Sequence, residues 1–228
     1  MGTNMSKDKQ KAANMNLQDL PTEILETIAG KLNIVALGAF RTTSRAVQAK
    51  TTKAFAEAVV PDHTLSVRLT IPGVQAALTG LRFDDIAEQA LHVHFRGGLD
   101  PNRRPKGPID REELKRLLRK LFERLQSLQS VEMNYSSRGD FQGPSDVVAV
   151  LAEQPLLRLQ TLKLHYLGIP VARLAELLNA HEKTLEHVLF ADLCACEEPN
   201  DISSAALFAH MRDNMSLASV RIDHANDA

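Results

Sequence analysis

The side chains that could bind a metal ion are few in this sequence. His92 and His94 are two residues apart, so on a β-strand they would project from the same face. His187 precedes Cys194 and Cys196, whose thiolates could in principle bind zinc. Neither group completes the four ligands of a zinc site, and a cysteine outside such a site usually packs as an inert small hydrophobe. We therefore expect no metal site and no cofactor.

Motifs for catalysis are also missing. The sequence has no glycine-rich phosphate loop and no strained nucleophile turn of the Gly-x-Ser-x-Gly type. The basic run Arg103-Arg104-Pro105-Lys106 could bind phosphate or act as a nuclear address, but such runs usually lie in solvated loops. The chain is therefore predicted to be non-catalytic.

Composition indicates an ordinary globular protein. Of the 228 residues 44% are hydrophobic and 24% are charged, and the net charge of −1 would not attract nucleic acid or anionic lipid. No segment approaches the roughly 18 apolar residues of a membrane span. Met1-Gly2 with Ser6 matches a myristoylation pattern, but a second membrane signal is missing. We expect a cytoplasmic or nuclear protein with neither nucleic acid nor membrane as a partner.

The elements that would position a site change in character along the chain. Residues 1–16 carry almost no large apolar side chain and predict a flexible leader. Residues 17–60 carry apolar side chains at helical spacings and predict three helices. The expected helices are one with the apolar stripe Ile24, Leu25, Ile28 and Leu32, a shorter one over Val35–Phe40, and a third, capped by Ser44, from Arg45 towards Ala58.

Residues 61–228 are predicted to alternate between strands and helices, which indicates an α/β fold. Alternation of apolar and polar residues from Leu65 to Ile71 is the two-residue period of a half-buried strand. Residues 97–110 are too rich in Gly and Pro for either regular state. Because helical crossovers separate the strands, the strands should be mainly parallel. Further strands are expected over Leu91–Phe95, Ser130–Tyr135, Thr161–Tyr166, His187–Ala191 and Ser219–Asp223, with helices over Gly73–Thr79, Glu112–Leu125, Asp146–Gln154, Val171–Ala180 and Ala205–Asn214.

A pattern apolar-x-x-apolar-x-apolar recurs after successive helical stretches. The copies are Leu128-Val131-Met133, Leu159-Leu162-Leu164, Leu185-Val188-Phe190 and Leu217-Val220-Ile222, two of which continue to Leu167 and Leu193. Equivalent residues are about 31, 26 and 32 positions apart, close to the longer leucine-rich-repeat lengths. One such unit cannot bury its own apolar face, so neighbouring units must stack. The alternative is a single α/β domain whose units only look repetitive.

The segment from Leu17 to Ala49 carries a set of residues in a fixed order and spacing: Leu20-Pro21, Glu23, Ile24-Leu25, Ile28, Leu32, Leu37, Phe40-Arg41 and Ser44-Arg45. In these residues it resembles an F-box, the three-helix motif that binds the Skp adaptor of SCF ubiquitin ligases. Val47 departs from the pattern, because many family members place tryptophan there. The remainder resembles the irregular leucine-rich-repeat regions that follow F-boxes in many fungal proteins. An ordinary helical cap over the end of a repeat array is the alternative for the first region.

The resemblance implies a substrate-recognition adaptor. An F-box module over residues 17–60 would bind a Skp-family protein and, through it, a cullin ligase, while stacked leucine-rich-repeat-like units over residues 61–228 would bind an unknown protein substrate. A repeat-based interaction scaffold with no ligase role is the alternative. The expected adaptor contacts, forming a patch that is partly exposed in the isolated chain, are Leu20, Pro21, Ile24, Leu25, Ile28, Leu37 and Phe40.

Strand alternation indicates where a substrate would bind. If the apolar pattern residues from Val131 to Ile222 face the core, the residues between them must face the other way. That candidate substrate face consists of Glu132, Asn134, Lys163, His165, Leu189, Ala191, Arg221 and Asp223. Apolar Leu189 and Ala191 among polar neighbours are typical of an interface centre with a polar rim. A face that is solvated, or covered by the C-terminal tail, is the alternative.

Overall fold

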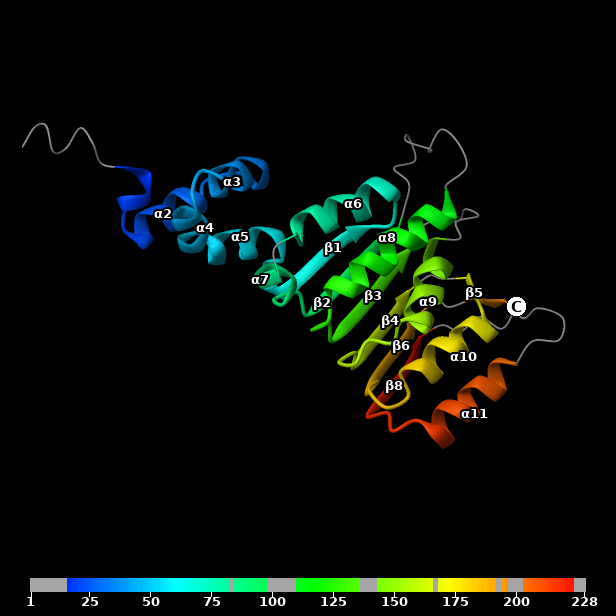
Figure 1. Cartoon of the computed structure of the whole chain (residues 1–228). Helices are drawn as coiled ribbons and strands as arrows, with labels where there is room; N and C mark the ends of the chain where they lie inside the picture. The colour runs from blue at the N-terminus through cyan, green and yellow to red at the C-terminus, as the bar shows by residue number, and fades with distance from the viewer. Residues whose placement is uncertain are drawn as a thin grey trace, which may run out of the picture. The chain divides into compact units, whose positions relative to one another are not determined.

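The computed structural model describes residues 16–82, 84–97, 110–135, 143–165, 168–191, 194–196 and 203–223 (Figure 1). The chain divides into two compact units, which we name the helical unit, residues 1–61, and the sheet unit, residues 62–228. Of the predicted leader, residues 1–16, only the last residue lies within the described ranges.

Short helices make up the helical unit. They are the 3-10 turn η1 (Leu17–Asp19) and the α-helices α2 (Thr22–Ala29), α3 (Ile34–Arg41), α4 (Arg45–Lys50) and α5 (Thr52–Val59). The Ser44 hydroxyl accepts a hydrogen bond from the N–H of Val47 at 3.1 Å, so the predicted cap is confirmed. The predicted third helix is in fact two, because the backbone leaves helical geometry at Thr51. The Thr51 hydroxyl donates to the carbonyl of Val47 at 2.7 Å, a side-chain bond that competes with helix continuation.

The helical unit has a small core of its own. Leu25, Leu37, Val47 and Phe55 are buried in it, and the guanidinium of buried Arg41 lies 4.5 Å from the centroid of the Phe55 ring. Val47, at the position where the F-box resemblance expects tryptophan, is therefore a packing residue of this core.

The sheet unit is an α/β structure with a six-stranded, all-parallel sheet in its described residues. In spatial order the strands are β1 (Thr64–Arg68), β2 (His92–Gly97), β3 (Ser130–Tyr135), β4 (Thr161–His165), β6 (His187–Ala191) and β8 (Ser219–Asp223). All neighbouring pairs are parallel, which confirms the predicted alternation and strand direction. Two short strands that the sequence did not predict, β5 (Gly168–Pro170) and β7 (Cys194–Cys196), form a separate parallel pair.

The longer helices of the sheet unit stack along one face of the sheet (Figure 1). They are α6 (Ile71–Gly80), α8 (Arg111–Arg124), α9 (Gly143–Glu153), α10 (Val171–Ala180) and α11 (Ser204–Asn214), with the short turns η2 (Pro61–His63) and α7 (Asp84–Ala87) in the connections. Each longer helix contacts the next one along the sheet. Residues 98–109, in the predicted loop, lie outside the described residues, and Asp110 caps α8 by accepting from the N–H of Glu113 at 3.0 Å.

The first strand ends earlier than its alternating pattern predicts. β1 stops at Arg68, and Ile71 is already the first residue of α6. Thr70 ends the strand by capping the helix, since its hydroxyl accepts from the N–H of Gly73 at 3.1 Å. Leu69 is still buried, and its N–H donates to the carbonyl of Arg96 at 3.1 Å, so of the alternating residues only Ile71 already belongs to the helix.

The same hydrogen-bonded junction precedes successive strands. One backbone carbonyl accepts from two consecutive N–H groups of the next unit along the sheet. The carbonyl of Leu91 accepts from Gln129 and Ser130, that of Gln129 from Gln160 and Thr161, that of Gln160 from Glu186 and His187, and that of Glu186 from Ala218 and Ser219. The connections are therefore geometrically equivalent and repeat a single local structure.

The core confirms most of the repeated apolar pattern. The leading residues Leu128, Leu159 and Leu185 are buried where the chain turns into each strand. A further copy that the sequence prediction did not include, Ala90-Val93-Phe95, is equally buried at β2, with alanine in place of the leading leucine.

The last strand departs from the predicted core. Val220 and Ile222 stand in register with Val188 and Phe190, yet they are 47% and 40% exposed. They lie on the predicted side of the sheet, but the expectation that they belong to the core is wrong: β8 is an edge strand and, unlike β1, against which α6 packs, it has no closely packed helix among the described elements. Alternation determines which side of a strand is apolar, but burial of that side requires another element that covers it.

A buried carboxylate joins two of the helices. Asp146, in the first turn of α9, is buried. Its carboxylate accepts a hydrogen bond of 2.7 Å from the guanidinium of Arg111, at the start of α8, and lies 3.9 Å from Lys115 Nζ.

We expect Arg111→Ala to lower the free energy of unfolding by about 2 kcal/mol, which is less than for a fully buried pair because Arg111 is half exposed. Urea denaturation followed by circular dichroism measures this. Arg116→Ala is the matched control, since exposed Arg116 pairs with Glu113 on its own helix, and its loss should leave stability unchanged. Equal losses in both variants would contradict the role of Asp146.

Candidate protein-binding surfaces

The face of the sheet that carries no described helix is built from the residues between the core positions. We name it the open face and define it by three cross-strand rows. The first row is Thr64, His92, Ser130, Thr161, His187 and Ser219; the second is Ser66, His94, Glu132, Lys163, Leu189 and Arg221; the third is Arg68, Arg96, Asn134, His165, Ala191 and Asp223. All eight residues of the predicted substrate face lie in the second and third rows, so their shared orientation is confirmed.

Carboxylate Glu132 is the centre of a charged cluster on the open face. Its two oxygens lie 3.7 Å from His94 Nε2 and 3.8 Å from Lys163 Nζ. Burial lowers the pKa of His94, although the charge of Glu132 acts in the opposite direction. The Nε2 atom of His94 is shielded from solvent and has no hydrogen-bond partner among the described residues. His94 is therefore neutral near pH 7, and Glu132 is mainly engaged with Lys163.

The β1 and β2 end of the open face carries two opposed arginines. Arg68 and Arg96 are cross-strand neighbours, both side chains are exposed, and neither forms an ion pair within the described part of the chain. The predicted substrate face did not include them, because the repeat pattern was recognised only from Leu128 onward. The alternation in Leu65–Arg68 and the pair His92 and His94 were the signals that could have extended the prediction to these strands.

The other end of the open face is less polar. Leu189 on β6 is half-buried and lies in register between Lys163 on β4 and Arg221 on β8. Ala191 in the third row is also half-buried and lies beside Asp223. A carboxylate oxygen of Asp223 lies 2.8 Å from Arg221 Nε. An apolar spot bordered by charges is thus present where the sequence predicted it.

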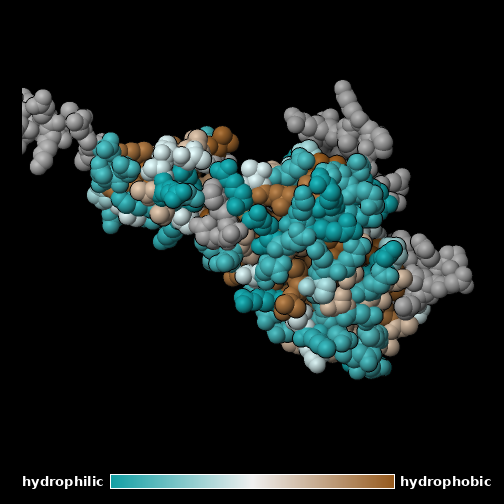
Figure 2. All heavy atoms as spheres, in the orientation of Figure 1, coloured by the Kyte–Doolittle hydropathy of each residue, from teal (hydrophilic) through white to brown (hydrophobic). Residues whose placement is uncertain are grey.

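The predicted adaptor contacts divide into exposed and buried residues. Pro21 and Ile24 are exposed, the latter by 48%, and Leu20, Ile28 and Phe40 are half-buried. Leu25 and Leu37 are buried in the core of the helical unit, so their predicted place in an exposed patch is wrong: each lies on the inner side of its helix. Val35, 81% exposed on α3, and Leu17 are apolar surface residues that the sequence prediction missed. Figure 2 shows apolar side chains at the surface of this unit.

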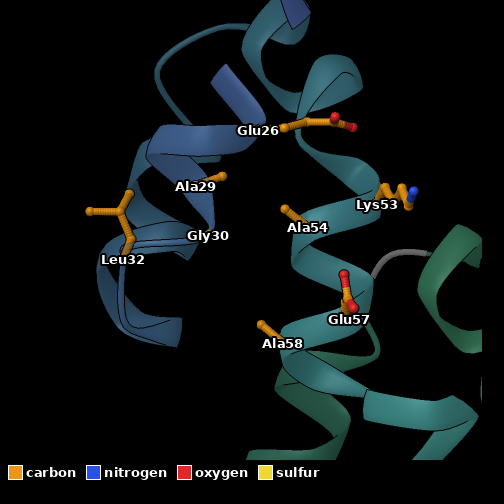
Figure 3. Close-up of a pocket in the computed structure, with 8 residues that line it drawn as sticks. All are labelled: Glu26, Ala29, Gly30, Leu32, Lys53, Ala54, Glu57 and Ala58. Atoms are coloured by element: carbon orange, nitrogen blue, oxygen red, sulfur yellow. The ribbon is translucent and has the colours of Figure 1, made fainter. Parts of the chain in front are cut away.

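A hollow of about 390 Å³ lies between α2 and α5 of the helical unit (Figure 3). It is lined by Glu26, Ala29, Gly30, Leu32, Lys53, Ala54, Glu57 and Ala58. Ala29, Ala54 and Ala58 point into the space, and their small size leaves it unfilled. The lining has no group of side chains arranged for catalysis, and the hollow is a groove between two helices.

The residues considered for metal binding lie apart or outside the described side chains. Within the described ranges no group of three or more His, Cys, Asp or Glu side chains could hold a metal ion. His92 and His94 do share one strand face, and His187 Nδ1 lies 2.8 Å from the hydroxyl of Ser219. Cys194 and Cys196 form β7, and their side chains are not described. None of the described helices is long and apolar enough to cross a membrane.

Comparison with protein-family models, with curated proteins and with solved structures finds no significant match for this chain.

Proposed function

We propose that the chain is the substrate-recognition adaptor of an SCF-type ubiquitin ligase. Its helical unit would be an F-box that binds a Skp-family protein and, through it, a cullin ligase. Its sheet unit would be an irregular leucine-rich-repeat-like region that binds a protein substrate, in the cytoplasm or the nucleus. The observation that carries this proposal is the division into two units, one helical with exposed apolar side chains and one that presents the open face, which no described helix covers (Figure 1).

The helical unit supports the first half of the proposal through its exposed residues. Ile24 and Val35 are large apolar side chains that remain in water in the isolated chain. Lys50 Nζ donates to the carbonyl oxygens of Gln18 and Leu20 at 3.1 and 2.8 Å, which holds the Leu20-Pro21 segment against α4. A fixed surface with exposed apolar anchors is what a partner protein can cover with a gain in free energy.

The mechanism needs no catalytic residue in this chain. A substrate bound on the open face would be held beside the ubiquitin-loaded subunit of the ligase. The transfer of ubiquitin then becomes nearly intramolecular, and the effective concentration replaces a diffusional encounter. The chain itself would make and break no covalent bond.

A repeat-based scaffold without a ligase role is the second candidate. It is favoured by the valine at position 47, because the helical unit lacks the large aromatic side chain that the F-box resemblance expects there. The open face would serve a scaffold equally well, so only the partner of the helical unit separates the two functions.

Co-purification with a Skp-family protein tests the proposal. We expect the wild-type chain to capture it and the double variant Ile24→Asp with Val35→Asp to lose at least about tenfold in capture, since interface anchors often contribute about 2 kcal/mol each. Both positions are exposed, so the variant should remain folded. Leu157→Asp is the matched control, because Leu157 is 80% exposed but lies in the sheet unit. Absence of capture by the wild-type chain, or undiminished capture by the double variant, would reject the F-box assignment.

A further inference from the structure

Two arginines directly opposite each other are an unusual feature of the open face. Arg68 and Arg96 are paired across β1 and β2, and like charges in that position repel. Both are exposed, and no carboxylate of the described residues forms an ion pair with either. An anionic group between them would relieve the repulsion and bind two guanidinium groups at once.

The acidic side chains of the open face cannot serve this purpose. Glu132 is engaged by Lys163, and Asp223 is engaged by Arg221. Over the three rows, the four side chains Arg68, Arg96, Lys163 and Arg221 face only these two carboxylates. The open face is therefore cationic, although the whole chain carries a net charge of −1. Its charge is complementary to an acidic partner.

The distance across the sheet sets a spacing for such a partner. Arg96 on β2 and Ala191 on β6 stand in the same row, three strand spacings apart. With about 4.8 Å between adjacent strands, the two positions are about 14 Å apart. An extended peptide advances about 3.3 Å per residue, so about four residues cover this distance.

Taking these features together, we propose that the open face binds an extended acidic segment of a protein. Acidic side chains of the segment lie between Arg68 and Arg96, and an apolar side chain about four residues away packs on Leu189 and Ala191. This inference deepens the proposed function and rests on it, since it names the class of substrate that the open face would select.

A peptide fits this surface better than a nucleic acid does. Glu132 lies in the middle of the second row and would repel a continuous track of phosphates. A peptide avoids this repulsion, because it can place an uncharged residue over Glu132 between its acidic and apolar positions. The apolar spot at Leu189 also has no counterpart in binding to a phosphate backbone.

Fluorescence anisotropy with the full chain tests the inference. The probe is a labelled peptide with two adjacent glutamates and a leucine four positions after the second, used in this order and in the reverse order. We expect at least one of the two to bind at least about tenfold more tightly than its counterpart with glutamine in place of glutamate. Equal binding of the acidic and glutamine peptides would overturn the inference, as would equally tight binding of a labelled oligouridine.

Charge-reversal variants locate the binding site. The double variant Arg68→Glu with Arg96→Glu should lose the preference for the acidic peptide. The control is the double variant Arg158→Glu with Lys183→Glu, which changes the net charge by the same amount at exposed loop positions outside the open face. It should keep the preference for the acidic peptide. Equal loss in both variants would show a general charge effect and overturn the assignment to Arg68 and Arg96. Circular dichroism checks that both variants remain folded.

Capture of the Skp-family protein, measured with the same preparations, separates this inference from the proposed function. A wild-type chain that captures the adaptor but has no preference for the acidic peptide overturns the inference and leaves the ligase role standing. A wild-type chain that prefers the acidic peptide but does not capture the adaptor supports the inference and rejects the ligase role. The chain would then be a repeat-based scaffold that binds acidic segments.

Discussion

Gly73→Ala should lower the free energy of unfolding of the sheet unit by about 3 kcal/mol. A β-carbon at this position would lie 2.2 Å from the carbonyl oxygen of Arg68, far inside van der Waals contact. The atom that it meets belongs to the backbone of β1, so rotation of a side chain cannot relieve the overlap. Gly73 is therefore required where the first turn of α6 crosses the end of β1. Urea denaturation followed by circular dichroism gives the loss, and hydrogen exchange can assign it to α6 and β1.

Gly38→Ala is the control for this prediction. Gly38 lies in α3, and an added β-carbon would have no atom within 4 Å other than its neighbours in the chain and the backbone of its own helix. Because alanine has the higher helix propensity, this change should stabilise the helical unit by up to about 1 kcal/mol. Replacement of glycine by alanine should therefore change the free energy of unfolding in opposite directions at these two helical positions. A stabilising effect at Gly73 would contradict the close approach of its backbone to the carbonyl of Arg68.

His181→Ala should cost the sheet unit about 3 kcal/mol of stability, through a cavity and an unpaired buried N–H. His181 is buried at the end of α10. Its Nε2 accepts from the backbone N–H of Leu156 at 3.0 Å, so the proton is on Nδ1, which donates to the carbonyl of Leu177 at 3.0 Å. The ring therefore ties the turn before β4 to α10. His187→Ala, at an exposed histidine on β6, is the matched control and should cost much less.

The same histidine makes stability depend on pH. Burial lowers the pKa of His181 below its ordinary value of 6.5, although the bond to Leu177 acts in the opposite direction. The unfolded chain therefore takes up this proton first as the pH falls. The contribution to stability is complete above about pH 6.5 and is lost as the pH decreases from there towards the folded pKa.

A comparison of urea denaturation at pH 7.5 and 5.5 measures this contribution. We expect the His181→Gln variant to lose less stability on acidification than the wild-type chain, because glutamine does not titrate. The pKa of His94 is also lowered, but His94 is present in both proteins, so its contribution cancels in the comparison. Identical pH dependence of the two proteins would contradict the role of His181.

Strand alternation is the structural feature of this protein that could be predicted most accurately from the residues alone. Ser130–Tyr135, His187–Ala191 and Ser219–Asp223 are strands with the predicted bounds. The orientation of Lys163 and His165 away from the core follows from the same period. The reason is local: successive side chains of a strand must point to opposite faces, whatever the strand packs against.

Exposure of individual apolar residues was decided by the tertiary structure. Ile24 and Leu25 are sequence neighbours in one helical stripe, yet the first is exposed and the second is buried. Val220 and Ile222 repeat the core pattern but lie on the edge strand. Periodicity identifies the apolar side of an element, but burial depends on whether another element covers that side.

The opposition of Arg68 and Arg96 is also a property of the tertiary structure. Each arginine lies on its own alternating strand, and α6 and α7 separate the two strands in the sequence. Whether they face each other depends on the register of β1 against β2, which is set by the hydrogen bonds between the strands and by the packing of Leu65, Val67, Val93 and Phe95. A shift of two residues would leave each side chain on its own side of the sheet but separate the two arginines, so only the assembled sheet determines the charge pattern of the open face.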